Sequence, residues 1–376
     1  MSVELLSPLV LIGFVIATVV QLFIWLYYFR QLAVFVKKET PDKSDKKDQV
    51  PVSIIICARN EENNLKKNLP RILNQNYRSF EVIVVDDKST DQTRNILSNF
   101  NISFRNLRVL HLAHKPAGSG KKPALAEGIR AAKHDILLFT DADCCPATNE
   151  WLNEMQRDIR GPIEIGLGYG PYEKRPGILN TFIRYETFFT LLQYGSFALA
   201  GHPYMGVGRN LIYKKELFDR VDGFDSHAHV MSGDDDLFIN QVATSTNTTL
   251  ILDKKTHVYS APTETWAAYY KQKTRHISTG KHYKSKHKFL LGLISSSHFF
   301  HYTLGLLLYI LDFGIIFATL LIVIRILVIL LVCKPILRKL QDRHLTLWTP
   351  VLDAVYVLFY MIFSISLIKG KIKQWT

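Results

Sequence analysis

The stretch Ile136-Leu137-Leu138-Phe139-Thr140-Asp141-Ala142-Asp143 joins a short apolar run to two carboxylates at its end. An apolar run of this length is typical of a strand that is buried on both faces of a parallel sheet. Open sheets of this kind bind ligands outside the carboxyl ends of their strands, where two carboxylates suit a hard divalent cation that carries substrate phosphates. An Asp-x-Asp triplet alone is more often a solvated turn, so its neighbours decide the interpretation.

The segment from Val52 to about Ser285 alternates short β-branched runs with amphipathic stretches. Buried strands are predicted at residues 52–57, 82–85 and 136–140, with a further strand at 108–112. Helical spacing predicts one helix around residues 65–73, kinked or shortened at Pro70, and another at 123–132. Strands that alternate with helices imply right-handed crossovers. The predicted fold class is therefore α/β, with a Rossmann-like, mostly parallel sheet over residues 51–285.

Apolar regions also occur at Leu9–Tyr28, Phe289–Cys333 and Leu347–Ile368. The first is long enough to cross a bilayer, and it lacks the basic flank and cleavage pattern of a secretory signal peptide. The second is too long for one span, and Asp312-Phe313-Gly314 predicts a turn between two. We expect an N-terminal anchor at 1–31, a charged linker at 32–50 and C-terminal transmembrane or interfacial helices at 286–376.

The chain carries 46 Lys and Arg against 33 Asp and Glu, a formal net charge of +13. Such an excess can indicate nucleic-acid binding, but basic residues beside a span mark the cytoplasmic side of a membrane. Those that follow the first apolar segment are Arg30, Lys37, Lys38, Lys43, Lys46 and Lys47. We therefore expect no nucleic-acid partner and a multi-pass protein of the inner cell membrane with a cytoplasmic central domain. The four cysteines match neither a zinc site nor a disulfide framework.

The number of C-terminal spans stays open. Three spans after the central domain would place Lys369, Lys371 and Lys373 outside, against the tendency of basic residues to stay inside. Two spans would place those three lysines inside, but they would put the basic residues of segment 338–343 on the outside.

Polar loops follow three of the predicted strands, at Ala58-Arg59-Asn60-Glu61, Asp86-Asp87-Lys88-Ser89 and Asp141-Ala142-Asp143. Because the carboxyl ends of parallel strands open on one edge of a sheet, these loops are expected to meet at one crevice. Taken alone, the pair Asp86-Asp87 would be better explained as part of a helix start, with N-cap candidates at residues 89–91. Three such loops favour a shared site.

Together these segments resemble the membrane-embedded branch of the inverting family 2 glycosyltransferases, which have the GT-A fold. The resemblance extends roughly from Pro51 to Ile277. The matching motifs are the Arg-Asn-Glu loop at 59–61, the segment 84–93, Gly120-Lys121-Lys122-Pro123-Ala124-Leu125, the triplet 141–143, Ser232-Gly233-Asp234-Asp235-Asp236-Leu237 and Gln272-Lys273-Thr274-Arg275-His276.

The resemblance implies transfer of a sugar from a nucleotide-sugar donor, taken as a UDP-sugar, to a hydroxyl of a lipid-linked or glycan acceptor. It implies Mg²⁺ or Mn²⁺ on Asp143 with Asp141. The implied donor-binding residues are Arg59, Glu61, Asp86, Asp87, Lys121, Asp141, Gln272 and Arg275. Arg209, which is either an acceptor or phosphate contact or part of a plain turn, and His276 are assigned to the acceptor side. His276 replaces the Trp of the family's Gln-x-x-Arg-Trp signature, which favours a single addition over processive synthesis.

The incoming hydroxyl has too high a pKa to attack unaided, so a carboxylate must accept its proton. Alignment on a Glu-Asp pair selects Asp235, whereas alignment on a Glu-Asp-x-Asp-Leu form selects Asp234 with Asp236 as support. We favour Asp235 and keep Asp234 as the alternative; the plain explanation of this triplet is a solvated helix start.

A rival hypothesis is a catalytically inactive GT-A-like membrane scaffold of an envelope assembly complex. A transporter is disfavoured because the predicted spans hold few charged residues, of which Asp312 and Arg325 are the obvious ones.

Overall fold

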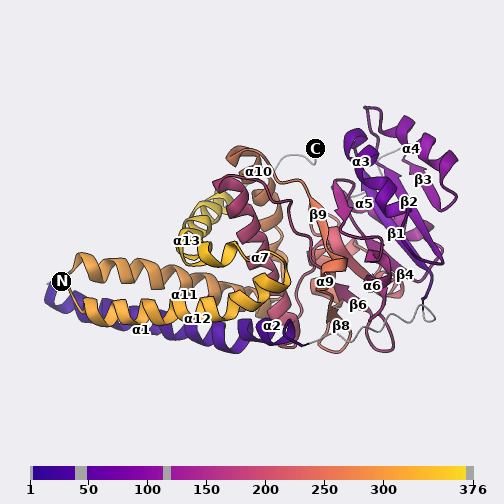
Figure 1. Ribbon diagram of the computed structural model, residues 1–376. Coiled ribbons are helices and arrows are strands. Elements are labelled where there is room, and N and C mark those ends of the chain that lie inside the picture. Colours follow the sequence, from indigo (N-terminus) through magenta and orange to yellow (C-terminus); the bar gives the residue numbers. More distant parts are fainter. Residues whose placement is uncertain (1–2, 39–48, 113–119, 370–376) are drawn as a thin grey trace. The chain divides into compact units, whose positions relative to one another are not determined.

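The computed structural model describes residues 3–38, 49–112 and 120–369 (Figure 1). These residues form two compact units. The helical unit comprises residues 3–38 and 283–369, and the sheet unit comprises residues 49–112 and 120–282. Lys43, Lys46 and Lys47 of the expected linker lie outside the described residues, as do Lys371 and Lys373.

The sheet unit is built on a seven-stranded sheet of order β3-β2-β1-β4-β7-β6-β8. β1 runs parallel to β2 and β4, and β2 runs parallel to β3, whereas β7 is antiparallel to β4 and β6. The sheet is therefore mostly parallel, which confirms the predicted fold class. The strands of this sheet are β1 (Val52–Ala58), β2 (Phe80–Asp86), β3 (Leu107–His111), β4 (Ile136–Phe139), β6 (Ile165–Leu167), β7 (Leu211–Lys214) and β8 (Thr248–Leu250).

A second, two-stranded sheet pairs β5 (Cys144–Pro146) with β9 (Val258–Ser260) in antiparallel register. Because β5 begins directly after the Asp141–Asp143 triplet, this pairing fixes the chain on the C-terminal side of the triplet. The helices of the sheet unit are α3 (Glu62–Leu73), α4 (Thr93–Ser103), α5 (Lys122–Ala131), α6 (Trp151–Gln156), α7 (Ile178–Leu199), α8 (Glu216–Asp219), α9 (Asp236–Val242) and α10 (Trp266–Ile277), with short 3₁₀ turns η3 (Gly208–Asn210), η4 (Asp225–His227), η5 (Lys254–Thr256) and η6 (Gly280–His282).

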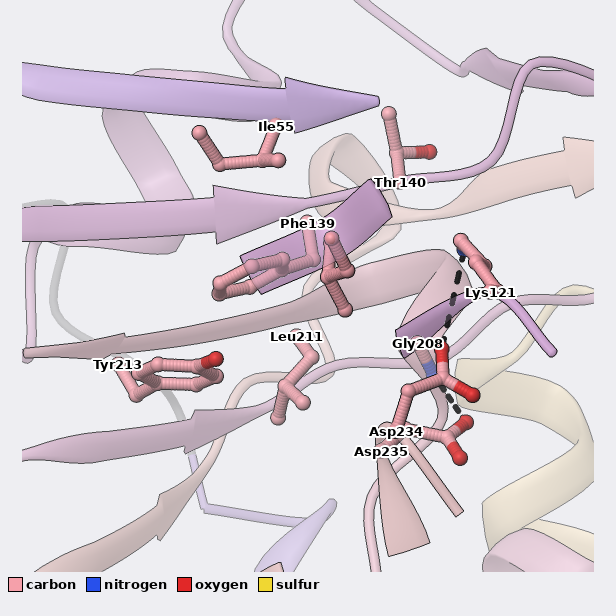
Figure 2. Close-up of a pocket in the computed structure, with 10 residues that line it drawn as sticks. Ile55, Lys121, Phe139, Thr140, Gly208, Leu211, Tyr213, Asp234 and Asp235 are labelled. Carbon is pink, nitrogen blue, oxygen red and sulfur yellow. Dashed lines mark hydrogen bonds and ion pairs between the residues drawn. The ribbon is translucent and has the colours of Figure 1, made fainter. Parts of the chain in front are cut away.

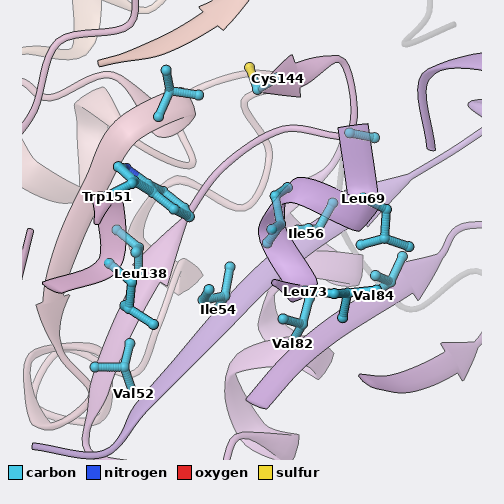
Figure 3. Close-up of a cluster of buried hydrophobic side chains, with 14 of the residues drawn as sticks. Val52, Ile54, Ile56, Leu69, Leu73, Val82, Val84, Leu138, Cys144 and Trp151 are labelled. Carbon is cyan, nitrogen blue, oxygen red and sulfur yellow. The ribbon is translucent and has the colours of Figure 1, made fainter. Parts of the chain in front are cut away.

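The core of the sheet unit follows from strands that are apolar on both faces. All seven residues of β1 are buried, as expected for a central strand covered by helices on either side. Side chains alternate between faces, so Ile54 and Ile56 of β1 lie with Val84 of β2 against Leu69 and Leu73 of α3 (Figure 3). The predicted helices at 65–73 and 123–132 are thus confirmed as α3 and α5, and α3 continues past Pro70 for one further turn.

The helical unit begins with α1 (Val3–Phe23), a π-helical turn η1 (Ile24–Phe29) and α2 (Arg30–Phe35). Its later helices are α11 (Ser285–Ile310), α12 (Ile315–Lys339) and α13 (Leu345–Lys369). Within the part of the chain that the structure describes, three helical stretches are long and apolar enough to cross a membrane: Leu6–Phe35, Ile315–Lys339 and Leu345–Phe363. The predicted N-terminal anchor and two of the later spans therefore have counterparts in the structure.

The predicted turn within 289–333 is confirmed, since α11 ends at Ile310 and α12 begins at Ile315, with left-handed backbone at Asp312 (φ 51°) and Gly314 (φ 61°). Of these two helices, α12 is a candidate span by length and composition and α11 is not, so two spans in this region stay a prediction. The run Ser295-Ser296-Ser297-His298 and His301 lower the hydropathy of α11.

A polar cluster is buried inside the helical unit. Arg325 of α12 pairs with Asp353 of α13 at 2.6 Å and donates to Gln21 of α1 at 2.8 Å, and Tyr302 of α11 donates to Asp353 at 2.7 Å. Arg325 and Asp353 are at most 1% exposed. The sequence interpretation recognised Arg325 but missed Asp353, which is the partner that makes a buried cation tolerable at this depth.

We expect Arg325→Leu and Asp353→Leu each to lower the free energy of unfolding by about 3–5 kcal/mol, because each leaves one charge buried without its partner. The double substitution Arg325→Leu with Asp353→Leu should recover most of that loss. Thermal or denaturant unfolding of the full chain in detergent micelles measures all three. A double variant as unstable as the worse single variant would show that the ion pair is not what stabilises this cluster.

Candidate active site

The Asp141–Asp143 triplet lies directly after β4, at the carboxyl edge of the parallel strands. The amide of Cys144 donates to the carbonyl of Asp141 at 3.1 Å, and Asn68 of α3 donates to the carbonyl of Ala142 at 3.2 Å. The backbone of the triplet is thus fixed by the sheet on one side and by α3 on the other. Its two carboxylates remain partly exposed.

The donor set of this triplet fits a hard divalent cation. Ligand atoms of Asp141, Asp143 and Cys144 lie within 4.8 Å of one another. Burial and the neighbouring Asp141 raise the pKa of Asp143, so a cation placed between the two carboxylates would relieve their repulsion. Burial also raises the pKa of the Cys144 thiol well above its usual value, which leaves a neutral sulfur that is a poor ligand. Two carboxylates without a thiolate suit Mg²⁺ or Mn²⁺.

Lys121, at the start of α5, connects this triplet to the segment Asp234-Asp235-Asp236. Its ammonium forms an ion pair with Asp141 and lies 3.9 Å from Asp234. Figure 2 shows Lys121 above Asp234 and Asp235, beside a small cavity that is also lined by Phe139. The apolar lining of this cavity comes from Ile55 of β1, Phe139 of β4 and Leu211 of β7, with Leu125 of α5.

Asp235 is the N-cap residue of α9, and both of its carboxylate oxygens accept backbone hydrogen bonds. The amide of Gly208 donates to one oxygen at 2.7 Å, and the amide of Asp236 donates to the other at 2.7 Å. Burial, with Asp234 and Asp236 close by, raises the pKa of Asp235 to about 8. The carboxyl group is therefore held firmly in place and titrates near neutral pH, as a general base should.

Arg209 lies within electrostatic range of both carboxylates of the triplet. Its guanidinium donates to the hydroxyl of Ser260 at 2.6 Å and stacks over the ring of Tyr172, 4.4 Å from the centroid. Ser260 pairs with Cys144 in the β5–β9 sheet, so this sheet connects the arginine to the triplet. Arg209, which the sequence left as either part of a plain turn or a functional residue, thus places a fixed positive charge beside the Asp141–Asp143 triplet.

The loops after β1 and β2 are joined by a set of hydrogen bonds. The carbonyl oxygen of the Asn60 side chain accepts from the amide of Thr90 at 2.8 Å, and the amide of Asn60 donates to Ser89 at 2.9 Å. Asn60 and Lys88 both adopt left-handed backbone, with φ of 56° and 58°. Arg59 is exposed at the end of this loop, and the carboxylate of Glu61 lies within electrostatic range of the triplet.

Asp86 and Asp87 differ in their surroundings, although both are buried. The carboxylate of Asp86 accepts from the amide of Ser89 at 3.0 Å and contacts His111 at 2.9 Å, so its oxygens are used within the fold. Among the described residues, none donates a hydrogen bond to the carboxylate of Asp87. Of this pair, Asp87 is therefore the one whose oxygens are available to a ligand.

Gln272, Arg275 and His276 lie on α10. Arg275 is within electrostatic range of Asp141, whereas His276 is exposed beside Arg275, with 3.5 Å between their nitrogens. Lys273, between Gln272 and Arg275, forms a buried ion pair of 2.5 Å with Glu186 of α7. The positive charge of the arginine in the predicted motif thus acts on Asp141 of the triplet.

The structure also reveals partners that sequence reasoning missed. Gly208 donates to Asp235, Ser260 orients Arg209, and the hydroxyl of Thr279 donates to Asp236. These residues carry no charge and occur at no fixed spacing from the residues they contact. Only the two glycines of Gly206-Val207-Gly208 gave a signal, because they suggest close backbone approach.

A mostly parallel sheet with an Asp-x-Asp triplet at its carboxyl edge defines the architecture of the GT-A fold. The family model "Glycosyl transferase family 2" matches residues 53–221, and "Glycosyl transferase family group 2" matches residues 140–334, which is more than half of the chain. The chain belongs to the family 2 glycosyltransferases.

Individual relatives agree with this membership. The chain is 25% identical to the probable glycosyltransferase YdaM of Bacillus subtilis (strain 168) over 265 residues, which are 66% of this chain and 59% of YdaM. It is 35% identical to the glycosyltransferase AglE of Haloferax volcanii over 112 residues, 29% of this chain and 36% of AglE. The chain thus spans less than two thirds of the length of these curated relatives.

One solved structure is similar over nearly the whole chain. The mannosyltransferase PcManGT from Pyrobaculum calidifontis, determined in complex with GDP-Man and Mn²⁺, matches with a TM-score of 0.57 at 19% identity. The match covers 95% of this chain and 99% of PcManGT. At this level of identity the likeness shows the fold.

Proposed function

We propose that this protein is a membrane-bound glycosyltransferase that moves a sugar from a nucleotide-sugar donor to an acceptor hydroxyl, with inversion at the anomeric carbon. The observation that carries the proposal is the position of Lys121, which contacts both Asp141 and Asp234. This lysine connects the carboxylates that suit a cation to the segment that holds Asp235, although the three segments lie far apart in the sequence.

In the proposed reaction the acceptor oxygen attacks the anomeric carbon, and the bond from that carbon to the phosphate oxygen breaks. The hydroxyl proton passes to the carboxylate of Asp235, and the nucleoside diphosphate leaves with the bonding electrons. Asp143 and Asp141 would hold Mg²⁺ or Mn²⁺, which supplies positive charge for the leaving diphosphate. Lys121, Arg209 and Arg275 add fixed positive charge on the same side.

The remaining donor contacts are proposals of the same kind. Asp87 has carboxylate oxygens available to the donor nucleotide, and Arg59 and Glu61 flank it on the neighbouring loop. PcManGT is described with GDP-Man and Mn²⁺, so a guanosine donor joins the UDP-sugar proposed from the sequence as a candidate. Because three helical stretches are candidate spans, we propose a lipid-linked or glycan acceptor at the membrane, with the sheet unit in the cytoplasm.

The direct test is transfer and donor hydrolysis by the full chain in detergent or lipid, with a panel of UDP- and GDP-sugars and Mg²⁺ or Mn²⁺. We expect at least one donor to release nucleoside diphosphate only when cation is present. A folded protein that turns over none of the panel would favour the alternative, a catalytically inactive scaffold. The retained carboxylates of the site argue against the scaffold, since a scaffold has no need of them.

The pH dependence of kcat/KM follows from the pKa of Asp235, which is raised to about 8 in the free protein. Below that pH the carboxyl group is protonated and cannot accept the acceptor proton. We therefore expect kcat/KM to rise by about tenfold per pH unit below pH 8 and to stop rising above it. Initial rates at subsaturating donor across this range measure the profile, and a flat profile on the acid side would contradict Asp235 as the base.

A further inference from the structure

A second lysine, next to Lys121, is buried against the segment that precedes the proposed base. Lys122 is only 2% exposed, and its ammonium donates to the carbonyl of His227 at 2.7 Å and to that of Val230 at 2.9 Å. Both carbonyls belong to residues 227–236, which we call the acidic loop because it ends in Asp234-Asp235-Asp236. Lys122 therefore fixes the backbone of the acidic loop rather than a side chain.

The turn that carries the two lysines touches the same loop at another point. Gly120 adopts left-handed backbone (φ 69°), and a Cβ at this position would lie 1.9 Å from the carbonyl oxygen of Met231. The backbones of the turn and the acidic loop are thus in direct contact. With the Lys121–Asp234 contact of 3.9 Å, successive residues 120, 121 and 122 all meet the acidic loop.

Burying this cation is unfavourable in itself. Among the described residues, Lys122 forms no ion pair with a carboxylate, and burial lowers the pKa of its ammonium to about 8 although Asp234, Asp236 and Asp235 oppose the shift. A buried charge that is satisfied by two carbonyls fixes a specific backbone arrangement but adds little net stability. The groups that face it from the acidic loop are the two carbonyls and, at longer range, the three carboxylates.

We infer that Lys122 is a positioning residue, which holds the acidic loop so that Asp235 stays at the correct distance from the Lys121–Asp141 ion pair. This inference deepens the proposed function. Its catalytic part, that Lys122 supports sugar transfer by positioning Asp235, rests on the proposed function. Its structural part, that Lys122 fixes the acidic loop, stands on the two hydrogen bonds alone.

The first measurement is hydrogen exchange in the full chain, comparing Lys122→Met with wild type. The amides of His227, Ala228 and Val230 are hydrogen-bonded within or just before the acidic loop. We expect them to exchange about tenfold faster or more in the variant, which is the effect of losing one charged hydrogen bond. Lys66→Met makes the same chemical change at an exposed lysine of α3 and should leave these amides unchanged.

The second measurement is steady-state kinetics of the same two variants with the active donor. We expect Lys122→Met to lower kcat by about 10- to 100-fold, the effect of a small misplacement of a catalytic group, with KM for the donor within about threefold of wild type. Unchanged exchange in segment 227–236 would overturn the positioning role whatever the activity. If exchange rises but wild type transfers no sugar, the positioning role stands and the proposed function fails. If exchange rises while kcat is unchanged, the catalytic meaning is refuted.

Discussion

Asp235→Asn is expected to lower kcat by about 10²- to 10⁴-fold while donor binding stays close to that of wild type, because the substitution removes the group that accepts the proton. An amide is close to the carboxyl group in size, but its NH₂ group cannot accept the hydrogen bond that Gly208 or Asp236 donates to the carboxylate, so the melting temperature of the variant is compared with that of wild type. Transfer assays give kcat, and calorimetry with the nucleoside diphosphate gives the binding constant.

Asp234→Asn separates the two candidates for the base. Asp234 lies 3.9 Å from Lys121, and we propose that it orients that lysine and does not accept the proton, so we expect a loss in kcat of only about tenfold. Asp219→Asn, which makes the same change at an exposed position of α8, is the matched control and should retain full activity. A larger loss for Asp234→Asn than for Asp235→Asn would exchange the two roles, and full activity of both would remove the base from this loop.

Asp143→Asn is expected to lower kcat/KM by about 10²- to 10³-fold at a fixed low Mg²⁺ concentration, because the amide would weaken the cation site that we propose for the leaving diphosphate. The deficit should shrink as Mg²⁺ is raised, since Asp141 would remain as a ligand for the proposed cation. Initial rates measured against Mg²⁺ concentration show both effects.

The control for this variant is again Asp219→Asn, whose rate should follow the wild-type dependence on Mg²⁺. A second control is the melting temperature of Asp143→Asn without cation. It should be no lower than that of wild type, because removing one of two neighbouring carboxylates relieves their repulsion and the raised pKa of Asp143. If Asp143→Asn followed the wild-type dependence on Mg²⁺, the cation would not be held by this triplet.

The central strands and the loops after them could be predicted because local sequence determines them. The run Val52–Cys57 is apolar except for Ser53 and rich in β-branched residues, which favours a buried strand in a parallel sheet. The polar residues directly after such strands then lie at one edge by topology alone. That reasoning predicted that the loops after β1, β2 and β4 share one edge, whereas Lys121 and Asp234 were assigned to the site only by the resemblance to the family.

The contacts between distant segments could not be predicted in this way. Nothing local to Lys122 indicates that it meets two carbonyls more than a hundred residues later, since a carbonyl is present at every position of the chain. Asp353 is similar: a single carboxylate in an apolar helix gains its meaning only from Arg325 on the neighbouring helix. The short strand β7 was not predicted from the sequence. Its four residues form a strand by pairing with β4 and β6, and nothing in their own sequence indicates that pairing.

The central claim is that one site holds the cation, the diphosphate and the base, and the most direct test is a structure of the full chain with Mn²⁺ and an unreactive nucleotide-sugar analogue. The account predicts the anomalous signal of Mn²⁺ between Asp143 and the diphosphate, with the carboxylate of Asp235 on the opposite side of the anomeric carbon. A diphosphate bound away from the Asp141–Asp143 triplet, or a donor sugar that does not face Asp235, would contradict it.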